Sequence, residues 1–385
     1  MKLRIGQILL LACLFVLFNC HDSVAPTHTV TYDGNGSTGG TVPVDSKGYA
    51  SGASVTILAN TGSLVKSGNV FSNWNSKADG SGTSYTPGAA FSMSTANTTL
   101  YANWTPSGSA WTSGTLPSSV AWQSVAFGNN TFVAVAVNSN VSAASTDGGR
   151  TWAAGTLPVS SSWSCVAYGA GVFVTLTDAA IGATSTDGIN WTKKTIPGYA
   201  YLGLVYANNI FVAVGPNGSS SIVSSDGATW KTGVLPESAY WTSVAYGNNT
   251  FVAVAAGGKN AAASADGITW TAQTLPTSAS WYSMAFGNGT FVAVDGNGKN
   301  AATSADGINW TLQALPVSGE WHVAFGNGAF VAVDLSSNNV ATSTDGATWK
   351  SYQTLPSTTM WNAITYGNGN FVTISNKDNV VAIGN

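Results

Sequence analysis

One sequence pattern recurs at intervals of about forty residues from residue 111 to the end of the chain. Its longest copy is Ser-Thr-Asp-Gly-Gly-Arg-Thr-Trp at residues 145–152, and the tryptophans that end successive copies are 39, 39, 40, 40 and 39 residues apart. The five shorter copies end at Trp191, Trp230, Trp270, Trp310 and Trp349. A repeat of this length, made of short apolar runs between Gly-rich turns, predicts four β-strands per repeat and is typical of β-propeller blades.

The composition favours an all-β protein of an exported type. Only 8% of the 385 residues are charged, Gly is abundant with 44 residues, and no stretch combines apolar residues at helical spacing with Glu and Lys. The 13 basic and 16 acidic residues form no basic stripe, so nucleic-acid binding is not expected. No pattern of metal ligands is visible, and nothing in the sequence indicates a cofactor.

The first twenty residues have the pattern of an export signal. A basic start precedes an apolar run at 8–18 that is too short to span a bilayer. The segment ends in Leu-Phe-Asn-Cys at 17–20, which resembles a bacterial lipoprotein signal, although Asn19 replaces the usual small residue. The resemblance implies lipidation of Cys20 and anchoring to a bacterial outer membrane or cell surface through the lipid alone. Simple cleavage near this point and an unprocessed anchor remain alternatives.

The cysteines do not predict a disulfide framework. Cys13 lies in the leader, and with Cys20 lipidated, Cys165 has no partner in the mature chain. We therefore expect Cys165 to be a buried, unreactive thiol. Loss of the leader leaves 11 basic and 16 acidic residues, which is a net charge of −5.

A linker at 21–26 precedes a separate small unit at 27–104. Its motifs are, in order, Val30-Thr31-Tyr32-Asp33-Gly34, Trp74, the Ala-Asp-Gly turn at 78–80, Tyr85 and Leu100-Tyr101-Ala102-Asn103-Trp104. This pattern resembles the internalin-type B-repeat, also called the Listeria–Bacteroides repeat, with Asn73 where the family usually has Gly. The resemblance implies a β-grasp-like domain that serves bacterial surface proteins as a spacer or adhesive unit. Alternating apolar runs between Gly-rich turns also predict a small sheet with the aromatic residues in its core.

Residues 105–385 predict a seven-bladed propeller with four strands, A to D, in each blade. Period-two alternation places strands A to C of the first blade at 122–127, 131–135 and 142–146. The aromatic residues that open strand A of successive blades are Trp122, Trp163, Tyr201, Trp241, Trp281, Trp321 and Trp361. The chain ends at Asn385 after the seventh strand C, so we expect Ala110–Leu116 to supply the missing strand D and to close the ring.

The turns before strand D resemble the Asp-box of sialidases and other propellers, Ser-x-Asp-x-Gly-x-Thr-Trp. Residues 145–152 match this pattern in full, and the other five copies are one residue shorter. The aspartates are Asp147, Asp187, Asp226, Asp266, Asp306 and Asp345, and the tryptophans are Trp152, Trp191, Trp230, Trp270, Trp310 and Trp349. The resemblance implies a structural role on the face away from any active site. Physically, the carboxylate accepts N–H bonds from its own turn, Gly takes a positive φ, and Trp buries its ring.

Catalysis is not expected. A sialidase-like site needs a cluster of arginines around the substrate carboxylate, whereas this chain has only Arg4, in the leader, and Arg150, in an Asp-box-like turn. Other glycoside hydrolases need two carboxylates at a set separation, and Glu237 and Glu320 are the only glutamates.

The predicted ligand site lies where the B–C and D–A loops of blades five and six meet, opposite the Asp-box-like turns. Asp295 and Asp334 end strand B of these blades, and Glu320 and His322 enter blade six. Acids in Gly- and Asn-rich loops are ordinary turn formers, an interpretation that we favour over catalysis. A one-residue deletion places His322 where other blades have a small residue and is expected to turn Trp321 to the opposite side of the strand. For the opening aromatics as a set, packing between blades is favoured over sugar stacking.

The favoured interpretation is a non-catalytic, lipid-anchored surface protein whose propeller binds a glycan or a surface protein. One alternative is a carbohydrate-active propeller enzyme, which would need a carboxylate pair at a defined spacing on the site face. The other is an extracytoplasmic assembly or stability factor, because Asp-box propellers also resemble the photosystem assembly factors. That role would need a charged patch, which the low charge count does not favour.

Overall fold

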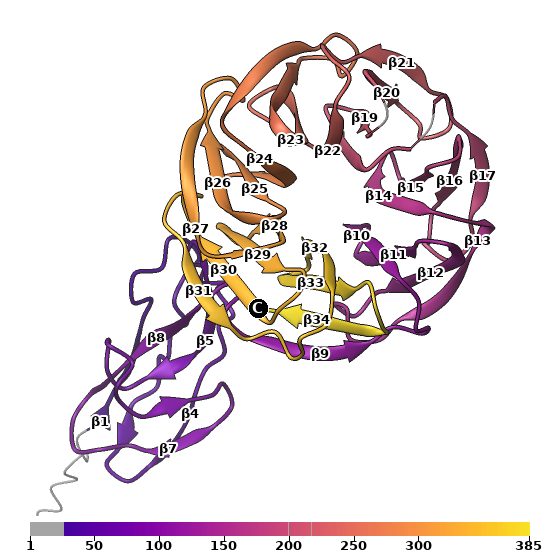
Figure 1. Cartoon of the computed structure of the whole chain (residues 1–385). Coiled ribbons are helices and arrows are strands. Elements are labelled where there is room, and N and C mark those ends of the chain that lie inside the picture. Colours follow the sequence, from indigo (N-terminus) through magenta and orange to yellow (C-terminus); the bar gives the residue numbers. More distant parts are fainter. Residues whose placement is uncertain (1–26, 199, 217) are drawn as a thin grey trace, which may run out of the picture.

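The computed structural model describes residues 27–198, 200–216 and 218–385. The predicted export signal and Cys20 lie outside these residues. All regular elements of the described part are β-strands, which form a small N-terminal module and a ring of sheets (Figure 1). The predicted all-β propeller fold is therefore confirmed. None of the described residues belongs to a helix long and apolar enough to cross a membrane.

The N-terminal module packs around one tryptophan. Its strands are β1 (Thr27–His28), β2 (Val30–Asp33), β3 (Tyr49–Ala50), β4 (Ser54–Thr56), β5 (Asn69–Asn75), β6 (Ser84–Tyr85), β7 (Ala90–Ser92) and β8 (Thr98–Pro106). The main sheet has the order β2-β8-β5-β6, with β2 parallel to β8. Trp74 is fully buried, its indole N–H donates to the Leu58 carbonyl at 3.0 Å, and its ring meets Tyr32 edge-on. Aromatic rings thus belong to the core, together with aliphatic side chains such as Val55 and Leu100.

The ring consists of seven four-stranded antiparallel blades, with strand A nearest the axis (Figure 1). Blade one is β10 (Trp122–Gly128), β11 (Thr131–Ala136), β12 (Ser139–Ser145) and β13 (Ala153–Ser161); blade two is β14 (Trp163–Gly169), β15 (Val172–Thr177), β16 (Ile181–Ser185) and β17 (Thr192–Thr195); blade three is β18 (Gly203–Ala207), β19 (Ile210–Val214), β20 (Ser220–Ser224) and β21 (Lys231–Val234). Blade four begins with β22 (Tyr240–Gly247), and β23 (Thr250–Ser264) supplies its strands B and C. The long β24 (Thr271–Gly287) is strand D of blade four and strand A of blade five, so these blades share one sheet.

The remaining blades repeat this order. Blade five continues with β25 (Thr290–Asp295), β26 (Gly298–Ser304) and β27 (Thr311–Gly319); blade six is β28 (Trp321–Gly326), β29 (Ala329–Asp334), β30 (Asn339–Ser343) and β31 (Lys350–Gln353); blade seven is β32 (Trp361–Gly367), β33 (Asn370–Ser375), β34 (Val380–Gly384) and β9 (Trp111–Thr115). Strand β9 pairs with β34 from Trp111–Gly384 to Thr115–Val380, which confirms the predicted closure of the ring.

Aromatic rings fill the spaces between blades. The six opening tryptophans are fully buried and Tyr201 is 2% exposed, so the packing interpretation of these rings is confirmed. The indole of Trp122, for example, donates to the Ser118 carbonyl at 3.0 Å. Strand A ends in a glycine in most blades, and Gly128 lies against the ring of Tyr168 in the next blade, where a side chain would overlap it. Glycine therefore lets adjacent blades approach closely.

Six turns between strands C and D share one hydrogen-bond pattern. We call them aspartate turns, and they lie at 145–152, 185–191, 224–230, 264–270, 304–310 and 343–349. In the second, Asp187 Oδ1 accepts the N–H groups of Ile189 and Asn190 at 2.9 and 2.8 Å, and Ser185 donates to it at 2.9 Å. Trp191 donates its indole N–H to the carbonyl of Gly188, which has φ 75°. The predicted use of the carboxylate within its own turn is confirmed.

Candidate ligand-binding site

Asp295 bonds to the loop that follows its strand. It is 3% exposed at the end of β25, and both carboxylate oxygens are used within the following B–C loop. Oδ1 accepts the N–H of Asn297 at 3.0 Å, and Oδ2 accepts the side-chain amide of Asn300 at 2.7 Å. These bonds agree with the turn-forming interpretation, and a ligand contact of Asp295 stays a prediction.

Asp334 has the same role in blade six. It is 3% exposed, accepts the N–H of Glu320 at 3.1 Å, and accepts the Ser337 hydroxyl at 2.6 Å. The carboxylate thereby ties the B–C loop to the D–A loop, and a ligand contact of Asp334 stays a prediction. Glu320 contributes its backbone to this contact, while its side chain is exposed at the same face.

Trp321 keeps the position of the other opening aromatics, so the predicted turn toward the opposite side is wrong. The residue is fully buried and pairs with Asp334, the last residue of strand B. In blade five, a β-bulge after the opening tryptophan adds Tyr282 before the next paired residue. Blade six has no bulge, and His322 pairs directly after Trp321. The deletion therefore removes the bulged residue and leaves the Trp321 indole in place, because a bulge absorbs one residue without changing the register beyond it.

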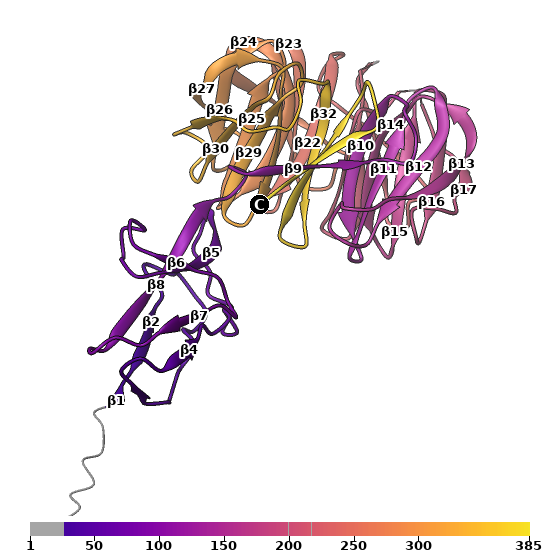
Figure 2. The same cartoon turned by 90° about the horizontal axis from the view of Figure 1, so that it is seen from below.

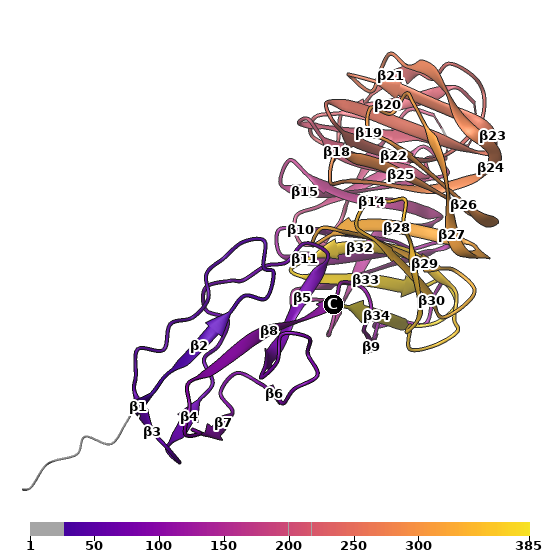
Figure 3. The same cartoon turned by 90° about the vertical axis from the view of Figure 1, so that its left-hand side faces the viewer.

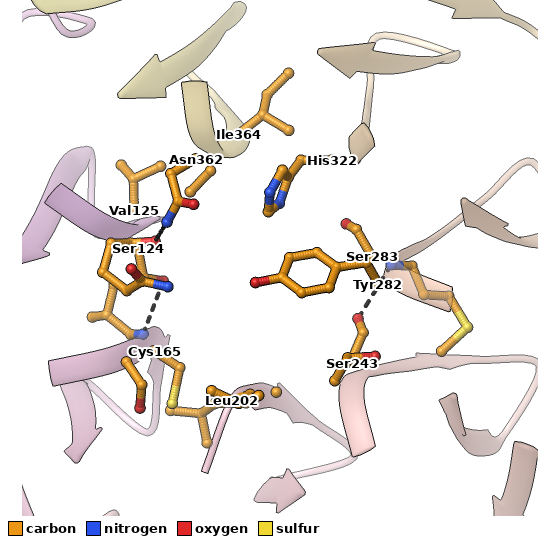
Figure 4. A pocket seen from close by; sticks show the side chains of 18 of the residues that line it. Ser124, Val125, Cys165, Leu202, Ser243, Tyr282, Ser283, His322, Asn362 and Ile364 are labelled. Atoms are coloured by element: carbon orange, nitrogen blue, oxygen red, sulfur yellow. Dashed lines mark hydrogen bonds between the residues drawn. The ribbon is translucent and has the colours of Figure 1, made fainter. Parts of the chain in front are cut away.

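A cavity of about 240 Å³ lies on the propeller axis, between the first residues of the seven A strands (Figure 4). Its polar side chains are Gln123, Ser124, Ser164, Thr242, Ser243, Tyr282, Ser283, His322 and Asn362. Figure 4 shows Tyr282 and His322 pointing toward the centre from adjacent blades. Since strand A begins at the D–A loop, the cavity belongs to the face predicted for the ligand. Of the five predicted residues, only His322 lines it.

Hydrogen bonds between blades hold the cavity wall in place. Ser124, Ser243 and Ser283 each accept a backbone N–H of the next blade, at 3.2, 3.1 and 3.1 Å. Asn362 donates its side-chain amide to the Gln123 carbonyl at 2.9 Å, which links blades seven and one. The cavity is consequently formed before any ligand arrives, and binding there needs little ordering of side chains.

The groups that face the cavity are neutral at neutral pH. The rings of Tyr282 and His322 meet edge-on, with centroids 5.2 Å apart. Burial lowers the pKa of His322 to about 4, although part of the imidazole contacts the cavity. Burial also raises the pKa of Tyr282, with smaller contributions from Tyr240 and Glu320. Nowhere in the described residues do three or more His, Cys, Asp or Glu side chains form a group that could hold a metal.

The sequence analysis missed the residues that directly follow the opening aromatics. They are Gln123, Ser164, Leu202, Thr242, Tyr282 and Asn362, and all of them line the cavity. The signal for them was present, because this position changes from blade to blade while the residues beside it repeat. In a repeat whose packing positions are uniform, such variation marks a position that packing does not determine.

Two parts of the chain match known domain families. Residues 28–103 match the Listeria-Bacteroides repeat domain, in agreement with the motifs in the sequence. Residues 125–240 match the DUF6242 beta propeller domain. A Gly-rich membrane protein of Evansella cellulosilytica is 40% identical over 78 residues, which are 20% of this chain and 9% of that protein. The chain therefore spans only a small part of that relative.

Solved structures resemble the propeller. A streptogramin B lyase matches with a TM-score of 0.64 and 14% identity, over 71% of this chain and 97% of that one. Virginiamycin B lyase from Staphylococcus aureus matches with a TM-score of 0.64 and 13% identity, over 71% and 98%. YCF48 bound to a D1 peptide matches with a TM-score of 0.59 and 18% identity, over 71% and 94%. At these identities the likeness establishes the propeller fold alone.

Proposed function

We propose that this chain is a non-catalytic protein of the bacterial cell surface whose propeller binds a glycan or protein ligand at the axial cavity. The preformed ring of neutral hydrogen-bonding groups around the axis carries the proposal. Tyr282, His322 and Asn362 can replace the water around an uncharged polar group, and apolar residues such as Leu202 and Met284 line the same space. A few polar groups set among apolar ones are characteristic of ligand pockets.

The cavity takes only the tip of a ligand. Its volume of about 240 Å³ is below the range of about 300–1,000 Å³ usual for sites that enclose a whole small molecule. One sugar unit or one side chain fills it, and the rest of the ligand lies on the surrounding B–C and D–A loops. A glycan and an extended peptide both meet this requirement.

The position of the N-terminal module agrees with display of the cavity to the outside. Asn327, in the A–B turn of blade six, donates to the Asn69 carbonyl and the Ser107 hydroxyl, both at 2.8 Å. The A–B turns and the aspartate turns share one face of the ring, and the module lies on that side (Figure 2). The cavity is near the other face. A chain anchored through Cys20 therefore presents the cavity away from the membrane.

Surface location is supported by two of the matches. The Listeria-Bacteroides repeat and the likeness to a Gly-rich membrane protein both accord with an exported, membrane-associated chain. We further propose that Cys20 is lipidated and that the aspartate turns are Asp-box repeats with a structural role. Detergent-phase partitioning of wild type and Cys20→Ser tests the anchor, since attached acyl chains move a protein into the detergent phase. Equal recovery of both proteins in the aqueous phase would contradict lipidation.

The binding proposal is tested by probing a glycan and extracellular-matrix protein array with the whole chain. A ligand found there should bind Tyr282→Phe and His322→Ala about tenfold more weakly, because each loses one hydrogen bond to a desolvated group. Tyr246→Phe is the control, because its hydroxyl contacts Asn249 in the A–B turn on the other face. An array without any bound component, or unchanged affinity in both cavity variants, would overturn the proposal.

A carbohydrate-active enzyme is the alternative function. The burial of Asp295 and Asp334, each bonded within its own loops, favours binding over hydrolysis. Incubation of the purified chain with fluorogenic glycosides, a sialoside included, is expected to release no fluorophore. Turnover above the uncatalysed rate would replace the binding proposal with an enzymatic one.

A further inference from the structure

A second cavity lies between the module and blade six, on the side of the ring opposite the axial site. It has a volume of about 340 Å³. Its walls are Gly68, Asn69 and Pro106 from the module and Ala329, Thr342, Ser343, Thr344, Asp345, Thr348, Lys350 and Tyr352 from blade six. We call this cavity the junction cleft. Figure 3 shows the end of β5 and β8 that approaches the ring beside the yellow strands of the last blades.

The walls of the junction cleft are held at a fixed separation. Gly68 donates its N–H to the Asn327 carbonyl at 2.8 Å, and Asn327 in turn binds Asn69 and Ser107. The approach at Gly68 is so close that a Cβ atom there would lie 2.6 Å from the Thr344 methyl group. Two units that interlock in this way form a preformed cleft, which a ligand occupies without ordering the domains first.

Blade six differs from the other blades at the surface that faces the module. Lys350 and Tyr352 alternate along its outer strand β31, Thr348 lies in the aspartate turn before that strand, and all three line the cleft. Cross-strand pairing shows which residues of the other six blades correspond to Tyr352. They are Gly155, Lys194, Gly233, Gln273, Gln313 and Gly114. An aromatic ring thus occurs at this position only in the blade that forms the cleft.

We propose that the junction cleft binds one or two units of a neutral saccharide. Tyr352 offers a ring on which a sugar face stacks, and Thr344 and Thr348 offer hydroxyl groups. Lys350 donates hydrogen bonds and Asp345 carries the balancing negative charge. The lining therefore favours a ligand that donates and accepts hydrogen bonds and has no net charge. Vicinal sugar hydroxyls meet this requirement, and the volume suits one or two pyranose rings.

The test uses the full chain and four defined probes: cellotetraose, mannotetraose, chitotetraose and the acidic tetragalacturonate. Binding is measured by titration calorimetry and saturation-transfer NMR. At least one neutral tetrasaccharide is expected to bind, with an affinity about tenfold lower in Tyr352→Leu and in Lys350→Ala. Lys231→Ala is the matched control, because Lys231 occupies in blade three the position that Lys350 has in blade six.

The outcomes separate this site from the axial cavity. Binding at the junction cleft is expected to be unchanged in Tyr282→Phe. A glycan of the axial cavity should instead bind Tyr282→Phe about tenfold more weakly and bind Lys350→Ala as well as wild type. Lys350 is exposed, so Lys350→Ala tests the proposal even if Tyr352→Leu folds poorly. Absence of binding by all three neutral probes, preference for tetragalacturonate, or equal affinity in wild type and Lys350→Ala would each overturn the proposal.

Discussion

The six aspartate turns are compared with the turn at residues 108–111, which leads into β9 and which we call the closing turn. Both kinds of turn pack against the preceding blade in the same way, but their hydrogen bonds come from different residues. In each aspartate turn, the glycine lies against a valine in strand B of the preceding blade, as Gly188 does against Val133. In the closing turn, Gly108 takes this place against Val331, where a Cβ atom would lie 2.6 Å from the nearest methyl group. Gly108 has φ 70°, comparable with 75° at Gly188.

The hydrogen bonds of the closing turn also follow the pattern. Trp111 donates its indole N–H to the Gly108 carbonyl at 2.8 Å, three residues earlier, as Trp230 does to Gly227 at 3.2 Å. In an aspartate turn, the residue before the tryptophan donates its N–H to the carboxylate. In the closing turn, Ala110 donates instead to Oδ1 of Asn385 at 3.2 Å. The closing turn is therefore assembled from two segments that lie 275 residues apart.

The difference shows what local and distant contacts each contribute. The carboxylate hydrogen bonds of an aspartate turn join residues within one stretch of seven or eight consecutive residues. The closing turn forms only when the ends of the propeller meet, because Ala110 bonds to Asn385 and Gly108 packs against Val331 of blade six. Blade six also differs in the partners of the asparagine in its A–B turn, Asn327. Asn288 binds carbonyls of the next A–B turn and aspartate turn, whereas Asn327 binds the module.

Deletion of residues 105–117 should have the largest effect, because it removes β9 and the closing turn together. The seventh blade then has an unpaired edge and loses the buried Leu116, so we expect the melting temperature to fall by about 10 °C or more. Differential scanning calorimetry measures this change. Deletion of residues 27–104 is the control and should leave the melting of the propeller nearly unchanged. Equal losses in the two proteins would show that the ring closes in another way.

Acid should weaken the aspartate turns and spare the closing turn. Backbone N–H bonds from Thr229 and Ala228 lower the pKa of Asp226 to about 2 from the ordinary 3.8. This stabilisation is complete above pH 3.8 and is lost as pH falls through about 2, because the unfolded state takes up the proton first. His322, whose pKa is about 4, lowers stability in a separate window between pH 6.5 and 4. The amide of Asn385 does not titrate.

Calorimetry between pH 7 and 2 should show these two steps in the melting temperature. The total fall in melting temperature should exceed the fall caused by any single substitution in a turn. Indole N–H exchange followed by NMR distinguishes the turns, with Trp230 exchanging faster as pH falls to 3 and Trp111 changing less. Equal acid sensitivity of the two indoles would remove the distinction between the turns.

Single substitutions should show how much each kind of turn contributes to the free energy of unfolding. Asp226→Ala removes the acceptor of three hydrogen bonds, from Ser224, Ala228 and Thr229. We expect it to lower the free energy of unfolding by about 1–2 kcal/mol, and Asn385→Ala, which loses one long bond, by about 0.5–1 kcal/mol. Chemical denaturation with urea measures both. A larger loss for Asn385→Ala would mean that closure depends more on this side chain than the geometry indicates.

The smallest effect on stability is expected from Asn327→Ala. This substitution removes the two bonds that the Asn327 side chain makes to Asn69 and Ser107, keeps the Gly68–Asn327 backbone bond and leaves every blade paired, so the melting temperature should change by about 2 °C or less. Small-angle scattering should show a larger radius of gyration, because fewer hydrogen bonds then hold the module against blade six. Asn288→Ala is the matched control, since it removes the equivalent bonds within the ring. An unchanged scattering profile for Asn327→Ala would show that other contacts hold the module.

Much of the fold could be predicted because it follows from local repetition. The forty-residue period, the alternation within each strand and the Ser-x-Asp-Gly turns are properties of consecutive residues, and they were sufficient to place the strands. Closure by Ala110–Leu116 followed from the same repeat, because this segment copies the residues that follow an aspartate turn. The burial of Trp74 and of the opening aromatics followed from their size and repeated position.

The candidate sites were decided by tertiary structure. A deletion in blade six could remove a bulge or turn a side chain over, and only the pairing of Trp321 with Asp334 shows that the bulge is lost. The side chains that meet at the axis are about forty residues apart in the sequence, so no local pattern groups Tyr282 with His322. The junction cleft and the role of Asn385 in the closing turn depend on contacts over still longer separations. Sequence periodicity determines strands and turns because their hydrogen bonds join near neighbours, whereas cavities are made by the packing of side chains that the chain brings together only when the ring has closed.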